Sequence, residues 1–207
     1  LLVLLLPLAA RLALLDALHD ARVMVDVDTR KSRIRSQIEA EAQRIGGHAR
    51  ITESLLDEVT ALVEWPVAIT GHFEDAYLQL PPEVIVATVE TNQRYFTVFS
   101  DPQQTRLTNA FITVANIESR DVQQVITGNE RVVRPRLSDA LFFYQQDLKQ
   151  PLEAYAQQLA AVTFQQSLGS VADKAHRIQG LAAEIAAQLT DDSRALADVA
   201  RAAQLSK

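Results

Sequence analysis

The sequence has 207 residues, of which 48% are hydrophobic and 22% are charged, ordinary proportions for a chain that buries a globular core. It contains no cysteine, which excludes disulfide scaffolds and cysteine-ligated zinc or iron sites. The formal net charge of -6 excludes a surface that is cationic throughout, so any contact with nucleic acid requires a local cluster of basic residues.

The chain begins at Leu1, and its single methionine is Met24. We therefore expect an internal fragment of a longer protein. Residues 1–18 are the one place where a targeting or membrane segment could lie. Pro7, Arg11 and Asp16 interrupt the apolar run before it reaches the roughly 20 residues that a spanning helix needs. The sequence predicts a helix here, with a signal or an anchor as the alternative.

A short strand is predicted over 22–28, where valines alternate with other residues. A helix over 29–45 follows, and Gly46 and Gly47 provide its left-handed end. Thr52 is expected to cap a second amphipathic helix. The apolar face of that helix is predicted to consist of Leu55, Leu56, Val59, Leu62 and Val63.

Short apolar segments begin after Trp65. We predict strands over 66–73, 76–80, 94–99 and 110–115. Pro81 and Pro82 open a short helix between the second and third strands, because proline fits the first helical turn. This order of elements predicts an α+β fold, in which a mixed sheet layer is covered by flanking helices.

Residues after 116 are predicted to be helical. Ser119 is expected to cap a helix that ends at Gly128, and Ser138 is expected to begin the next one. From Pro151 to the end of the chain, alanine, leucine and glutamine recur at helical spacing, with breaks near Gly169 and at 191–193. The pattern predicts an all-helical domain that is truncated.

No catalytic or metal-binding motif is evident. The histidines His19, His48, His72 and His176 are not at ligand spacing, and the glycines are too scattered for a phosphate-binding loop. The dipeptide of His19 and Asp20 suggests a metal-dependent phosphohydrolase, which would need further ligands that the sequence does not show. We therefore predict that this chain has neither catalytic residues nor metal, with such a hydrolase as an alternative.

Basic residues are concentrated in one part of the chain. Segment 51–93 contains eight acidic residues and no lysine or arginine, whereas 94–136 contains six arginines and four acidic residues. The densest part is 129–137 (NERVVRPRL), which Pro135 is expected to hold partly extended. The candidate RNA-binding residues are Arg94, Arg120, Arg131, Arg134 and Arg136.

Two interpretations of these arginines stay open. They could bind phosphate, with nearby aromatic residues stacking on unpaired bases, although strand alternation assigns at least half of those aromatics to the core. They could instead form internal salt bridges. The carboxylates expected as partners in that case are Glu118, Asp121, Glu130 and Asp139.

Six motifs in this order and spacing resemble the β subunit of the bacterial, tetrameric type of glycyl-tRNA synthetase. The resemblance runs from about Asp28 to the C-terminus. The motifs are LVEWP (62–66), NQRYF (92–96), FITVANIESR (111–120), GNERVVRPRL (128–137), DALFFY (139–144) and FQQSLG (164–169). Thr97 and Tyr144 depart from the pattern common in that family.

The resemblance implies a non-catalytic part of a cytoplasmic glycine–tRNA ligase, used in protein biosynthesis. In that family the α subunit activates glycine with ATP and magnesium, and the β subunit of the α2β2 tetramer binds tRNA(Gly). It implies no cofactor in this chain and no membrane or DNA partner. We expect an N-terminal segment of helix, strand and helix at 1–50, an α+β module with the arginine cluster at 51–150, and the start of a truncated helical HD-like domain at 151–207. The alternative is a scaffold that docks the α subunit without contacting tRNA.

Overall fold

The computed structural model describes residues 8–207, and part of the helix predicted at 1–18 lies outside that range. The chain divides into two compact units between Phe142 and Phe143. The α+β class is confirmed, whereas the three-part division at 50 and 150 stays a prediction. None of the helices within 8–207 is both long and apolar enough to cross a bilayer.

The first unit is built around a four-stranded sheet of order β1-β3-β4-β2. All three strand pairings are antiparallel, and β2 runs beside β4 from Val67 opposite Ala115 to His72 opposite Ala110. β2 ends at His72 and β4 begins at Leu107, so this pairing closes a long loop. The strands are β1 (His48–Ala49), β2 (Val67–His72), β3 (Phe96–Phe99) and β4 (Leu107–Ala115).

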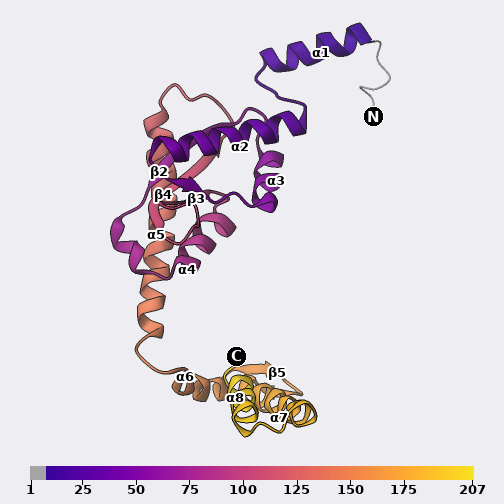
Figure 1. Cartoon of the computed structure of the whole chain (residues 1–207), viewed down its shortest axis with the longest axis vertical. Helices are drawn as coiled ribbons and strands as arrows, with labels where there is room; N and C mark the ends of the chain where they lie inside the picture. The colour runs from indigo at the N-terminus through magenta and orange to yellow at the C-terminus, as the bar shows by residue number, and fades with distance from the viewer. Residues whose placement is uncertain (1–7) are drawn as a thin grey trace. The chain divides into compact units, whose positions relative to one another are not determined.

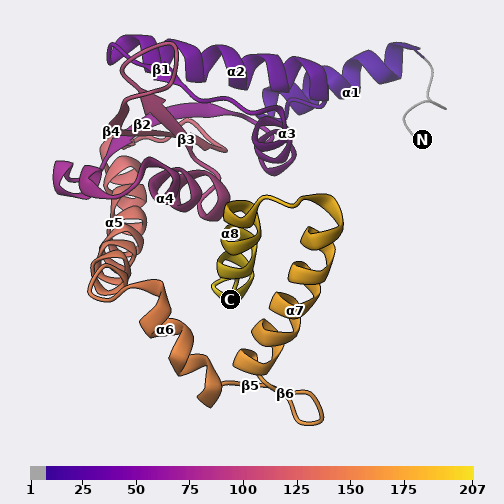
Figure 2. The same cartoon turned by 60° about the horizontal axis from the view of Figure 1, so that its bottom comes forward.

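Helices cover both faces of this sheet. Figure 2 shows α2 (Val27–Arg44) on one side of the strands, and α4 (Pro82–Val86) with the first part of α5 (Val122–Asp147) on the other. Figure 1 shows α3 (Glu53–Leu62) next to the strands. Its buried side chains belong to the core on the α2 side. The fully buried side chains on that side are Ile34, Ile38, Leu56, Phe96, Val98 and Ile112.

The helices α2 and α3 follow the sequence prediction closely. Thr52 caps α3 by accepting a hydrogen bond from the Leu55 amide at 3.4 Å. Gly46 ends α2 with a φ of 73°. Gly47 is required for a different reason, because a Cβ there would lie 2.5 Å from Val98 Cγ1. Leu62 was wrongly assigned to the buried face of α3, since it is 63% exposed.

The strand predicted over 22–28 is wrong. Residues 23–26 form an irregular link between α1 (Leu8–Asp20) and α2, and Asp26 caps α2 by accepting from the Thr29 amide at 2.7 Å. That capping bond lowers the pKa of Asp26. Arg30 donates to the Met24 carbonyl and, at 3.0 Å, to the Thr60 carbonyl. Valine alternation without a neighbouring strand was therefore insufficient to make a strand.

The strand predicted over 76–80 is also wrong. Asp75–Gln79 forms a 3-10 helix, in which the Tyr77 amide donates to Glu74 and the Leu80 amide donates to Tyr77, each at 3.0 Å. A five-residue apolar pattern does not distinguish a short strand from a single helical turn. The helix opened by Pro82 is confirmed, and it continues as a π-helix over Ala87–Asn92.

A single long helix, α5, replaces the two helices predicted around Gly128 and Ser138. It passes through Gly128 and Pro135 without ending, so the extended conformation expected at Pro135 is wrong. Val133 and Leu137, one helical turn apart, are both fully buried. Their packing at helical spacing outweighs the local preference of glycine and proline to interrupt a helix.

The second unit contains α6 (Leu152–Gln158), α7 (Val171–Leu189) and α8 (Ser193–Gln204). It is not all-helical, because β5 (Thr163–Gln165) and β6 (Gly169–Ser170) form a small hairpin. The predicted breaks near 169 and 191–193 are confirmed. Ser170 and Asp173 form a reciprocal capping box at the start of α7. Gly169 has a φ of 83°, and a Cβ there would meet Asp173 Oδ2 at 2.4 Å.

Candidate nucleic-acid interface

Arg94 occupies the bend between the π-helix and β3. Its backbone is left-handed, with a φ of 62°. Its guanidinium donates to the Glu58 carboxylate of α3. Both side chains are partly exposed, so the ion pair adds little stability. Arg94 therefore has a protein partner that a phosphate would have to displace.

Arg134 also has a carboxylate partner. It lies on α5 and pairs with Glu74, which precedes the 3-10 helix. Glu58 and Glu74 both belong to the acidic segment 51–93. The internal pairing expected for the arginines of 129–137 is thus right in kind for Arg134, but with a carboxylate that was not expected, and Arg94 forms a pair of the same kind.

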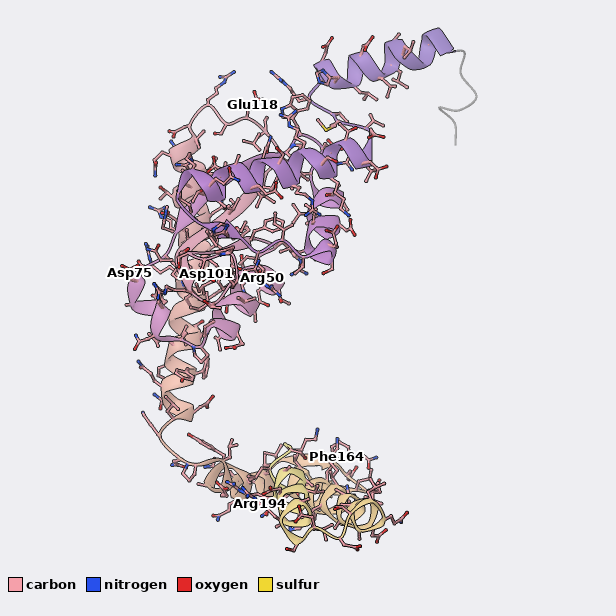
Figure 3. All side chains as sticks on the ribbon, viewed as in Figure 1. Arg50, Asp75, Asp101, Glu118, Phe164 and Arg194 are labelled. Carbon is pink, nitrogen blue, oxygen red and sulfur yellow. The ribbon has the colours of Figure 1, made fainter. Side chains whose placement is uncertain are left out.

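The four carboxylates expected as partners have other roles. Glu118, in the loop between β4 and α5 (Figure 3), pairs with Arg22 at 3.8 Å and accepts from the indole of Trp65 at 3.2 Å. Asp121 accepts from the Gln124 amide at 3.1 Å. Glu130 accepts from the His72 amide at 2.9 Å. No ion pair of Asp139 is found within residues 8–207.

Arg120, Arg131 and Arg136 are exposed. In the part of the chain that the structure describes, none of the three forms an ion pair with a carboxylate. Arg120 lies just before α5, and the other two lie on it. Their charges are therefore available to an anionic ligand without breaking an internal contact.

The helical path of α5 separates the arginines of the NERVVRPRL segment. At 100° per residue, Arg131 and Arg134 lie about 60° apart on the helix, whereas Arg131 and Arg136 lie about 140° apart. Arg131 points away from the buried pair Val133 and Leu137, and Arg136 lies nearer to it. An extended chain, as expected at Pro135, would have placed these charges in a different pattern.

A shallow hollow of about 360 Å³, here called the α5 groove, follows the first turns of α5. The residues that line it, apart from Gly128, carry polar or charged side chains and include Arg131. Asp121 is its one acidic residue, and both carboxylate oxygens of Asp121 accept from Gln124, at 3.1 Å from the amide and 3.0 Å from the side chain. The α5 groove is lined by Asp121, Gln123, Gln124, Thr127, Gly128 and Arg131.

The aromatic residues near these arginines differ in burial. Phe96 and Phe99 are buried in β3, as strand alternation and a covered sheet require. Tyr95 stacks on Phe111 with ring centroids 5.2 Å apart and donates to Asn129 Oδ1 at 2.5 Å. Burial raises the pKa of Tyr95. Phe142 and Phe143 are 56% and 62% exposed, and Tyr95 and Tyr144 are half-buried. Only two of the six aromatics considered are therefore buried, and the expectation that at least half of them belong to the core is wrong.

A buried ionisable network was not anticipated from the sequence. Glu90, in the π-helix, is only 6% exposed and accepts from the hydroxyl of Thr97 and the guanidinium of Arg50. Burial raises the pKa of Glu90. Glu90 borders a hollow of about 420 Å³ that Arg50 also lines, and Figure 3 places Arg50 beside the strands. In the sequence, Glu90 directly follows the apolar residues Ile85 and Val89 of a helical pattern. A carboxylate at that place was the one sign that it could be buried.

The histidine of the HD dipeptide packs against an aromatic side chain. The ring of His19 packs edge-on against Trp65 with centroids 5.1 Å apart. The guanidiniums of Arg22 and Arg33 lie 5.0 and 4.7 Å from the centroid of the same indole. Within residues 8–207, no group of three acidic or histidine side chains is arranged to hold a metal ion.

Comparison with known proteins gives a consistent result. The family model described as the glycyl-tRNA synthetase beta subunit matches residues 9–207. The glycine–tRNA ligase beta subunit of Chromohalobacter salexigens is 51% identical over 193 residues, and that of Xanthomonas campestris pv. campestris is 47% identical over 193 residues. Each comparison covers 93% of this chain and 27% of the relative. The corresponding protein of Pectobacterium atrosepticum is 49% identical over 175 residues, which cover 84% of this chain and 25% of the relative. The chain therefore spans about a quarter of the length of these relatives.

Proposed function

The chain belongs to the glycyl-tRNA synthetase beta-subunit family, and from that premise we propose that it helps to hold tRNA(Gly) for aminoacylation with glycine. In this proposal a separate α subunit activates glycine with ATP and magnesium, in a cytoplasmic α2β2 tetramer. This chain contributes binding and architecture, and it supplies no group that forms the new ester bond.

The observation that carries the proposal is the state of the arginines. Arg120, Arg131 and Arg136 are exposed and have no carboxylate partner within residues 8–207. A guanidinium presents donors that match a phosphate in a planar fork. The free-energy cost of transferring a guanidinium from water to an RNA phosphate is smaller when no internal ion pair has to be broken first. The proposal therefore ranks these three above Arg94 and Arg134, which already have partners.

A matched pair of variants tests this ranking. The first variant carries Arg120→Ala, Arg131→Ala and Arg136→Ala, and the second carries Arg94→Ala and Arg134→Ala. We expect the first to weaken binding of a fluorescent tRNA(Gly) transcript at least about tenfold by anisotropy, which corresponds to about 1.4 kcal/mol. The second should weaken it less, because part of its charge is already neutralised. Unchanged affinity of the first variant, with an unchanged circular dichroism spectrum, would remove the proposed role.

A scaffold role is the second candidate, and one observation favours it. Arg94 forms an ion pair with Glu58 of α3, and Arg134 of α5 forms one with Glu74. Both arginines thus link separate elements of the fold. If the region only docks the α subunit, the chain should capture purified α subunit in the absence of tRNA. The three-arginine variant should then capture it as well as the wild type and bind tRNA no worse.

A further inference from the structure

The face of α5 that points away from the sheet carries two residues that weaken a helix. Gly128 and Pro135 are seven residues apart, which places them within about 20° of each other around the helix. Arg131 lies between them in sequence and on the same side. Both Gly128 and Pro135 are exposed, opposite the buried pair Val133 and Leu137.

Neither packing nor backbone conformation requires glycine at position 128. A Cβ added there would meet no atom within 4 Å, and Gly128 has no positive φ. Alanine would favour the helix more strongly at such a position. A remaining physical use of glycine is to let another molecule approach the backbone closely.

Pro135 affects the same face. It has no amide hydrogen, so it cannot donate the helical hydrogen bond to the carbonyl oxygen of Arg131. This stretch therefore departs from the local rules of a stable helix at two positions, both beside an arginine that has no carboxylate partner in the described chain. Departures of this kind are expected at functional sites.

We propose that a ribose-phosphate strand of tRNA lies in the α5 groove in van der Waals contact with the backbone at Gly128, with a phosphate on the Arg131 guanidinium. The inference rests on the proposed function and assigns it a particular surface. It also assigns Gly128 a role in binding, although glycine has no charge or hydrogen-bonding side chain.

The lining of the groove favours RNA over a protein partner. Gln123, Gln124 and Thr127 offer hydrogen-bonding groups beside Arg131, and no large apolar side chain is among the lining residues. Protein interfaces usually contain an apolar or aromatic centre. Asp121 brings a negative charge, but its oxygens accept from Gln124 at the start of α5, where the helix dipole favours an acid.

Glycine substitutions test the close approach. Gly180 provides a matched control, since it also lies inside a helix, in α7, with nothing within 4 Å of an added Cβ. Gly128→Ala and Gly180→Ala should each raise the melting temperature by about 2–4 °C, because alanine stabilises a helix. Only the change at 128 should weaken tRNA(Gly) binding in the anisotropy assay, by about threefold for Gly128→Ala and at least about tenfold for Gly128→Leu.

The outcomes separate this inference from the function on which it rests. If both Gly128 variants bind tRNA as the wild type does while Arg131→Ala weakens binding, the groove assignment is wrong and the phosphate role of arginine stands. If the three-arginine variant also binds normally, both proposals fail. If Gly128→Leu loses only the α subunit and keeps tRNA affinity, the groove binds protein and the inference is overturned. Should Gly128→Leu fail to fold, the more stable Gly128→Ala variant still decides the question.

Discussion

Glu90 places a carboxylate among apolar side chains of the π-helix, where it accepts from Thr97 and Arg50. Burial disfavours its charged form and raises its pKa above the ordinary value of 4.5, despite the neighbouring guanidinium. The proton is then held more tightly in the folded chain than in the unfolded chain. Glu90 therefore contributes stability at low pH that is lost as pH rises through its folded pKa.

Glu90→Gln tests this pH dependence. Glutamine does not titrate, so it removes the increasing cost of ionising a buried carboxyl group. The melting temperature of Glu90→Gln minus that of the wild type, measured by circular dichroism, should increase as the pH is raised from 4 to 7. A relative melting temperature that is constant, or that falls over this range, would show that Arg50 compensates fully for burial.

Helix α5 connects the sheet to the residues of the candidate interface. Val133 and Leu137 are fully buried, while Arg131 and Val132 are exposed. The orientation of the α5 groove thus depends on two apolar anchors one turn apart. If these anchors are removed, the arginines lose their fixed positions even though their charges remain.

Leu137→Ala should therefore destabilise the chain by about 2–5 kcal/mol, because it deletes a buried side chain and leaves a cavity. Val132→Ala is the control on the same helix, since Val132 is 45% exposed, and it should change stability by less than about 0.5 kcal/mol. Urea unfolding at neutral pH measures both variants. Equal stabilities for the two would contradict the packing of α5 described above.

The predictable elements were those with long, regular patterns. Helices α2 and α3 followed from apolar spacing and from the capping residues Thr52 and Gly46, which act locally. The length of α5 was not predictable from local rules, because burial of Val133 and Leu137 against a distant sheet overrides Gly128 and Pro135. The strands predicted over 66–73, 94–99 and 110–115 are present as β2, β3 and β4. The two that failed, over 22–28 and 76–80, have no partner strand, and a few alternating residues become a strand only where one is available.

The candidate site was only partly predictable. Composition and charge located the basic segment, and the motifs identified the family. The partners of Arg94 and Arg134 could not be read from neighbouring residues, because Glu58 and Glu74 lie 36 and 60 positions away. Which arginines stay available to a ligand is therefore a property of the tertiary fold.

The whole chain combines a net negative charge with a few available arginines, so binding to RNA has to be local. Among residues 8–207, the α5 groove and the exposed arginines near it are the features to which the proposed function assigns RNA contact. The same assignment leaves the formation of glycyl-adenylate to another chain. The role proposed for this chain is accordingly to bind tRNA through local phosphate contacts.

Salt dependence of tRNA(Gly) affinity tests this claim most directly. Each phosphate contact releases counterions and contributes somewhat less than one unit to the slope of log affinity against log salt. We predict a steep negative slope for the wild-type chain that becomes shallower by about two to three units when Arg120, Arg131 and Arg136 are changed to Ala. An identical slope and affinity for the two proteins, with the fold intact, would contradict it.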